Sequence, residues 1–132
     1  MPQATNLVVK NGATPAVDKT YVLITPASGD GGIAVWNLKE GPISAVFPSL
    51  TAMSNRNANG TRRLTLKYKL PSSYTESVTG LTNVGSRAEV NVDVRVPEDF
   101  PEALKNDFVA YTANIINSEL IKSMMRDATP AT

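Results

Sequence analysis

One stretch of the sequence concentrates positive charge at a spacing that could bind nucleic acid. Between Glu40 and Glu76 there is no acidic residue. The stretch contains five cations, namely Arg56, Arg62, Arg63, Lys67 and Lys69. Residues 61–70 alternate between polar and apolar side chains, as a strand with one polar face does. That face would carry Arg63, Thr65, Lys67 and Lys69, and such side chains donate hydrogen bonds to phosphates, ribose hydroxyls and base edges.

Two neighbouring segments would widen this face if they pair with the basic strand. The added side chains would be Thr51, Met53, Asn55, Arg87, Glu89, Asn91, Asp93 and Arg95. Glu89 and Asp93 would repel phosphate unless arginines pair with them. Aromatic residues, which stack bases in single-stranded RNA sites, are missing from this face. The residues alone therefore leave two interpretations open, an RNA-binding surface or a solvated face that keeps the protein soluble.

The composition excludes most enzyme chemistry. The chain has no cysteine and no histidine, so serine triads and cysteine–histidine dyads lose their base, and metal sites built from thiolates or histidines lose their ligands. Glu98 and Asp99 form a carboxylate pair, but Asp99 is better explained as a helix cap. We predict that the protein is not an enzyme and has no catalytic residue, no metal site and no cofactor.

Signals for export and for membrane insertion are also missing. No apolar run approaches the roughly 20 residues that span a bilayer. The first six residues have neither the basic flank nor the apolar core of a signal peptide. We therefore expect a soluble protein, made inside the cell, that does not bind a membrane.

The patterns that position the polar face predict a single α+β domain over residues 1–132. Its expected parts are an N-terminal hairpin over residues 1–25, a sheet over residues 32–97 and two helices over residues 99–126. Within the sheet we predict a bend at Pro48, a tight turn at Asn59-Gly60 and an unstructured polar loop over residues 71–86. Strands with one polar and one apolar face indicate an antiparallel sheet that is covered on one side only.

The last third of the sequence has a helical period. Asp99 is predicted to be the N-cap, with Glu102 as its capping-box partner. One apolar stripe of the first helix comprises Leu104, Phe108, Tyr111 and Ile115. Asn117-Ser118 interrupts the pattern, and a second apolar stripe continues to about Arg126. These helices could cover their own sheet or that of a partner.

Three stretches resemble the coat proteins of the leviviruses, the small single-stranded RNA bacteriophages. Gly32-Ile33-Ala34-Val35-Trp36 is similar to a Gly-Val-Ala-x-Trp stretch of that family. Residues 62–71 resemble its basic strand, with the Thr-x-Lys pair and the closing proline. Residues 87–97 resemble its last sheet strand. The resemblance covers nearly the whole chain, and the order and spacing of the motifs carry it.

The resemblance implies a fold and a function. The fold would be an N-terminal β-hairpin, a five-stranded antiparallel sheet and two C-terminal helices that cross onto the partner subunit of an interlocked homodimer. Dimers would build an icosahedral shell whose inner face binds viral RNA, including a hairpin that signals packaging and represses translation. The loop over residues 71–86 would change conformation between the vertices of the shell. Implied partners are other copies of the chain, single-stranded viral RNA and a maturation protein. The expected location is the virion, assembled in the cytoplasm of a bacterial host.

The resemblance also assigns roles to residues. Thr51, Thr65 and Lys67 match positions that form adenine pockets, and Arg63, Arg87 and Asn91 match positions that touch RNA. Asn55 and Lys69, on the same predicted face, complete the candidate RNA-binding set. The candidate dimer interface is Phe108, Tyr111 and Ile115, packed on the partner's Val90, Val92 and Val94. Glu89 replaces an aromatic that stacks a base, and Met53 replaces a small hydroxyl residue, so we expect general RNA packaging more than recognition of one hairpin.

Two other functions remain open at this point. A cellular RNA-binding or regulatory dimer could use the same open basic sheet. An enzyme that acts through carboxylates and lysines is disfavoured by the missing histidine and cysteine.

Overall fold

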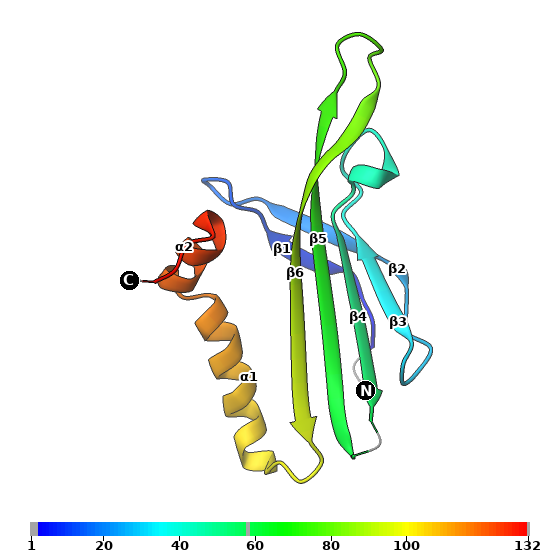
Figure 1. The fold of residues 1–132 in the computed structure, drawn as a ribbon. Helices are drawn as coiled ribbons and strands as arrows, with labels where there is room; N and C mark the ends of the chain where they lie inside the picture. Colours follow the sequence, from blue (N-terminus) through cyan, green and yellow to red (C-terminus); the bar gives the residue numbers. More distant parts are fainter. Residues whose placement is uncertain (1–2, 58, 132) are drawn as a thin grey trace. The chain divides into compact units, whose positions relative to one another are not determined.

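The computed structural model describes residues 3–57 and 59–131. The chain divides after Val96 into two compact units, an N-terminal unit of strands and a C-terminal unit of helices. In the first unit, six antiparallel strands lie side by side in chain order (Figure 1). The elements are β1 (Leu7–Lys10), β2 (Asp18–Thr25), β3 (Ile33–Asn37), the short 3-10 helix η1 (Ser44–Val46), β4 (Ser49–Arg56), β5 (Thr61–Thr75) and β6 (Thr82–Pro97).

The predicted hairpin and five-stranded sheet are both present, and they share a strand. β2 pairs with β1 in the N-terminal hairpin and with β3 in the main sheet. Its register with β3 shifts between Leu23 and Thr25, which marks a bulge. The fold class predicted from the sequence, an antiparallel sheet followed by two helices, is therefore confirmed.

The predicted turn at Asn59-Gly60 sets the register of the two central strands. The Gly60 N–H donates to the carbonyl oxygen of Asn57 at 3.1 Å, and Asn57 N–H donates to the carbonyl of Thr61 at 3.0 Å. Gly60 has a φ of 77°, a conformation that glycine adopts without steric cost. The pairing that follows runs from Arg56 opposite Arg62 to Ser49 opposite Lys69.

This register separates the two faces of the sheet, because opposed residues of an antiparallel pair project to the same side. Odd-numbered residues of β4 and β5 lie on one side, and even-numbered residues such as Leu50, Ala52 and Leu66 lie on the other. The even side is apolar from Leu64 to Leu70 on β5.

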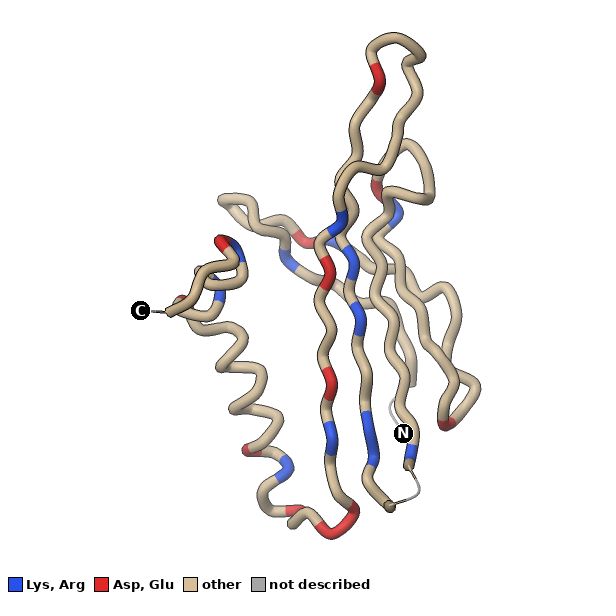
Figure 2. Tube along the Cα trace, viewed as in Figure 1, with Lys and Arg blue, Asp and Glu red and all other residues tan. Residues whose placement is uncertain are grey.

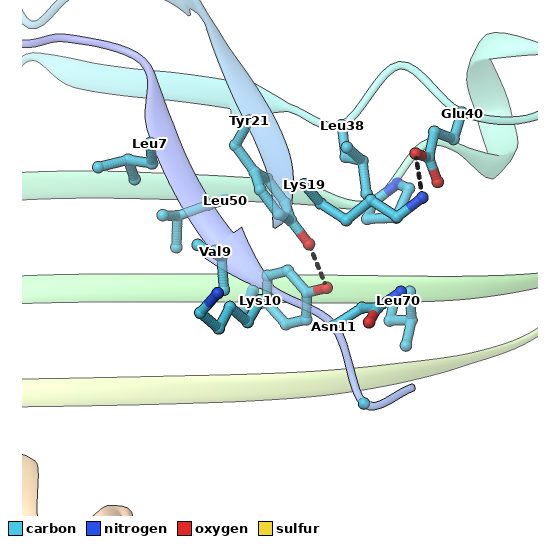
Figure 3. Close-up of a pocket in the computed structure, with 13 residues that line it drawn as sticks. Leu7, Val9, Lys10, Asn11, Lys19, Tyr21, Leu38, Glu40, Leu50 and Leu70 are labelled. Carbon is cyan, nitrogen blue, oxygen red and sulfur yellow. Dashed lines mark hydrogen bonds and ion pairs between the residues drawn. The ribbon is translucent and has the colours of Figure 1, made fainter. Parts of the chain in front are cut away.

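The N-terminal hairpin packs against part of the apolar side. Tyr21, Ala34 and Trp36 form the buried core, with exposed fractions of 5–9%. The indole Nε1 of Trp36 donates to the carbonyl oxygen of Thr5 at 2.8 Å. Figure 3 shows β1 crossing the strands of the sheet near Tyr21. The Tyr21 hydroxyl forms a hydrogen bond of 2.7 Å with the hydroxyl of Tyr68 on β5. Burial and this bond raise the pKa of Tyr21 above its ordinary value.

The prediction of a loop over residues 71–86 is wrong, because most of that segment is strand. β5 continues to Thr75 and β6 begins at Thr82, so the turn itself is only residues 76–81. The Ser72 hydroxyl donates to the carbonyl oxygen of Ser86 at 2.9 Å, and Glu76 N–H donates to the carbonyl of Leu81 at 2.9 Å. Serine and threonine are common in loops, but here cross-strand pairing orders them into a long two-stranded arm.

Two further local predictions are also wrong, and proline explains both. The chain before Pro48 is not an extended strand with a bend, since η1 occupies Ser44–Val46 and β4 begins only after the proline, which cannot donate to the ladder. Asp99 is not the helix N-cap. Pro101 holds that position in an extended conformation without a side-chain cap, and it disfavours helical geometry at the residue before it.

The C-terminal unit contains α1 (Glu102–Ile116) and α2 (Glu119–Asp127). The helices are separated at Asn117-Ser118, as predicted, and Ser118 caps α2 by accepting a hydrogen bond from the N–H of Ile121. No residue described in either helix is buried, and Leu120 is 61% exposed. Neither helix of the described chain combines the length and apolarity that a membrane crossing needs.

Candidate nucleic-acid interface

The sheet brings most of the predicted RNA-binding residues together on β4 and β5. The opposed pairs are Ser49 with Lys69, Thr51 with Lys67, Met53 with Thr65, and Asn55 with Arg63. These pairs form consecutive rows on one side of the sheet, roughly 7 Å apart, which is two residues of an antiparallel strand. We call the odd-numbered side of β4, β5 and β6 the polar face.

Two ion pairs show which side chains of β6 lie on the polar face. Arg63 of β5 contacts Asp93, and Lys69 contacts Glu89 at 3.9 Å. Arg87 and Asn91 are separated from these acids by even numbers of residues, so the alternation of a strand places them on the same face. All eight predicted RNA-binding residues therefore lie on the polar face.

One end of the polar face is partly charge-compensated, because one carboxylate pairs with two arginines. Arg63 donates from Nε and Nη2 to the two carboxylate oxygens of Asp93, both at 2.9 Å. Arg95 Nη2 donates to Asp93 Oδ2 at 3.2 Å. The hydrogen bond from Arg63, helped by that from Arg95, holds the pKa of Asp93 below its ordinary value. Asp93 is therefore ionised at neutral pH and occupies both arginines.

The other end carries cations with little compensation. Among the residues that the structure describes, no carboxylate lies within ion-pair distance of Lys67 or Arg87. The distance of 3.9 Å between Lys69 and Glu89 is too long for a hydrogen bond. Figure 2 shows the basic positions along β5 and the mixture of basic and acidic positions along β6. Positive charge on the polar face is therefore concentrated around Lys67, Lys69 and Arg87.

The polar face offers hydroxyls, amides and charge, and it does not offer aromatic rings. The odd-numbered positions of β4, β5 and β6 hold no aromatic residue. Tyr68, the aromatic residue of the basic strand, lies on the opposite side, bonded to Tyr21. Thr51 and Thr65 are half-buried between their neighbours, whereas Lys67 and Asn91 are exposed. Binding on this face would depend on hydrogen bonds and charge.

The predicted dimer-interface residues lie on α1 and are largely exposed. Tyr111 is 66% exposed and Ile115 59% exposed. Phe108 is half-buried and packs edge-on against Phe100, with ring centroids 6.2 Å apart. Phe100 precedes the helix, so the helical spacing that identified the stripe could not identify Phe100. Its aromatic side chain was the one feature of the sequence that could have indicated this contact.

The apolar side of the sheet also has side chains that one chain leaves accessible. Val90 on β6 is 39% exposed, and Leu64, Leu66, Val92 and Val94 are only half-buried. Both units therefore carry apolar side chains in contact with water, which is typical of surfaces that associate.

In the described part of the chain, no three acidic side chains gather as a metal ion would require. The structure instead defines a class of protein with an antiparallel sheet, a cationic hydrogen-bonding face on that sheet, and two helices with exposed apolar side chains. The chain matches the levivirus coat protein family over residues 2–131 and belongs to that family. It is accordingly a structural capsid protein of a virion and not an enzyme.

Solved structures of similar fold include several levivirus particles. The chain superposes on a virus-like particle of bacteriophage NT-214 with a TM-score of 0.87 and 21% identity, covering 99% of this chain and 100% of that one. A virus-like particle of Beihai levi-like virus 21 gives a TM-score of 0.84 at 17% identity, covering 99% of each chain. The capsid protein of bacteriophage GA gives 0.72 at 19% identity, covering 93% of this chain and 94% of that one. No curated protein matches the sequence.

Proposed function

We propose that this coat protein forms an interlocked homodimer, that dimers assemble into an icosahedral shell, and that the polar face binds the viral RNA inside it. The observation that carries the proposal is the opposite character of the two sides of one sheet. The polar face exposes a cationic field, and the other side exposes valines and leucines. Family membership favours this function over a cellular RNA-binding regulator with the same open sheet.

The helices supply the apolar surface that the dimer needs. Phe108, Tyr111 and Ile115 of one subunit would pack on the partner's Val90, Val92 and Val94, so that exposed apolar side chains of both units become buried. Burial of apolar area stabilises the pair by about 25 cal/mol per Å². Two sheets joined edge to edge would also remove the exposed edge of β6.

The RNA would be held mainly by charge. Lys67, Lys69 and Arg87 would contact phosphates, and Thr51, Thr65 and Asn91 would contact bases or riboses. Because Glu89 stands on this face and no aromatic residue does, selectivity for one hairpin would be modest. In this proposal assembly takes place in the cytoplasm of a bacterial host, with a maturation protein as a further partner.

Electron microscopy and absorbance of the purified protein test the assembly. We expect uniform shells whose ultraviolet absorbance ratio shows that they contain nucleic acid. Small soluble dimers without shells, at every protein concentration and with RNA added, would refute the assembly part of the proposal.

Filter binding across a salt series tests the RNA part. Each phosphate contact that is lost should reduce the slope of log affinity against log salt by about 0.7 for a single strand. Lys67→Ala should therefore lower the slope and weaken all RNAs alike, whereas Thr65→Ala should reduce the preference among hairpins. Lys10→Ala is the matched control, because Lys10 pairs with Asp18 at 2.9 Å on the N-terminal hairpin. Equal losses of RNA affinity in Lys67→Ala and Lys10→Ala, or RNA binding that does not depend on salt, would refute the proposal that the polar face binds RNA.

A further inference from the structure

A hollow lies at the end of the polar face that carries Lys69 and Arg87. It has a volume of about 220 Å³, several times the volume of a water molecule. Its polar lining comes from four adjacent strands and from η1, and consists of Asn37, Ser44, Ser49, Lys69 and Arg87. We call this feature the end hollow.

The strand register explains why these side chains meet. Asn37 of β3 is opposite Ser49 of β4, and Ser49 is opposite Lys69 of β5. Arg87 of β6 lies two residues before Glu89, the residue that contacts Lys69. Asn37, Ser49 and Lys69 thus form a row across three strands. Arg87 of β6 and the residues Ser44, Ala45 and Phe47 complete the lining around that row.

The lining of the end hollow is suited to a tetrahedral anion. It contains two cations, an amide and two hydroxyls, and none of its lining residues is acidic. The guanidinium of Arg87 can donate two parallel hydrogen bonds to a phosphate, and Lys69 adds a point charge. Ala45, Phe47 and Pro71 supply the apolar part of the lining.

We propose that the end hollow binds one backbone phosphate of RNA and anchors the strand without reading a base. The inference rests on the proposed RNA binding and adds three residues to it, Asn37, Ser44 and Ser49. The row of the end hollow is one step, roughly 7 Å, from the row of Thr51 and Lys67. That step is comparable with the separation of successive phosphates in an extended strand, so a strand anchored here would continue onto the predicted base-contacting residues.

Two substitutions on the same face of β6 provide the test. Arg87→Gln removes a cation from the end hollow, and Arg95→Gln removes one that is ion-paired with Asp93, a carboxylate it shares with Arg63. With an unstructured single-stranded RNA, Arg87→Gln should lower the salt slope by about 0.7, which is about a threefold change in affinity between 50 and 200 mM salt. Arg95→Gln should change it clearly less.

A second pair of substitutions acts at Ser44, an exposed residue of η1, and leaves the strands intact. Ser44→Asp places a negative charge at the end hollow and should weaken RNA binding at least as much as Arg87→Gln, whereas Ser44→Ala should change it little. If wild type binds RNA while Arg87→Gln and Ser44→Asp resemble their controls, the anchor is refuted and the proposed RNA binding stands.

Inorganic phosphate distinguishes the source of the anion. At constant ionic strength, phosphate should raise the unfolding temperature of wild type more than that of Arg87→Gln, because a ligand that binds only the folded state stabilises it. The same phosphate effect in a protein that binds no RNA would identify a site for free phosphate and would overturn the RNA anchor. If phosphate does not stabilise the wild type and Arg87→Gln does not weaken RNA binding, the end hollow is not an anion site.

Discussion

Asp93→Asn should increase RNA binding, although it removes two native ion pairs. Asp93 accepts two hydrogen bonds of 2.9 Å from Arg63 and one of 3.2 Å from Arg95. An asparagine keeps the size of the side chain but loses the charge that holds both arginines. The substitution would therefore free two cations on the polar face and remove one negative charge that repels phosphate.

The size of the effect follows from counterion release. Each arginine that takes up a phosphate should steepen the slope of log affinity against log salt by about 0.7 for single-stranded RNA. If both Arg63 and Arg95 do so, the slope steepens by about 1.4, and the loss of affinity between 50 and 200 mM salt grows about sevenfold. Filter binding of the purified protein over that salt range measures this change directly.

Asp30→Asn is the matched control for this experiment. Asp30 also pairs with an arginine of β5, Arg62, at 3.1 Å, and both partners are about half exposed. Arg62 is even-numbered and so lies on the opposite side of the sheet from Arg63. The two variants change the net charge equally, so only a site-specific effect can separate them. Equal slopes in Asp93→Asn and Asp30→Asn would show that net charge alone governs binding and would refute the assignment of Arg63 to the RNA surface.

Three further predictions concern the dimer, the arm and the tyrosine pair. Phe108→Ala should lower the free energy of unfolding by about 3–5 kcal/mol if the ring is buried in the dimer. In a denaturant series, with Val109→Ala as a control off the stripe, the midpoints of wild type and variant should both depend on protein concentration, as expected for an obligate dimer. A well-folded Phe108→Ala monomer at all concentrations would contradict the interlocked helices. Shortening residues 76–81 should leave the fold and RNA binding intact but give aberrant shells in electron micrographs. Normal shells would show that the arm does not determine the geometry of the shell. Tyr68→Phe should cost about 1 kcal/mol in denaturant unfolding, because it removes the hydrogen bond to the largely buried Tyr21 hydroxyl. Since folding raises the pKa of Tyr21, stability is retained below the ordinary tyrosine pKa of about 10 and lost as the pH rises above it, and unchanged alkaline stability would argue against that burial.

The sequence by itself determined the central strands, the two helices and the composition of their faces. Alternation along residues 61–70 and 87–97 assigned the polar side chains to one side of each strand, because the two-residue period of a strand is a local property. Asn59-Gly60 identified the central turn for the same local reason. The helical spacing of Phe108, Tyr111 and Ile115 likewise needed no knowledge of the rest of the chain.

Only the tertiary structure decided how charges and segments meet. Asp93 neutralises Arg63 from 30 residues away, and the end hollow joins Asn37, Ser49 and Arg87 from three different strands. The long arm exists because residues 71–75 pair with the start of β6, although their composition is that of a loop. In each case the deciding contact depends on the register between strands, which is set by pairing over distant parts of the sequence and not by the local pattern.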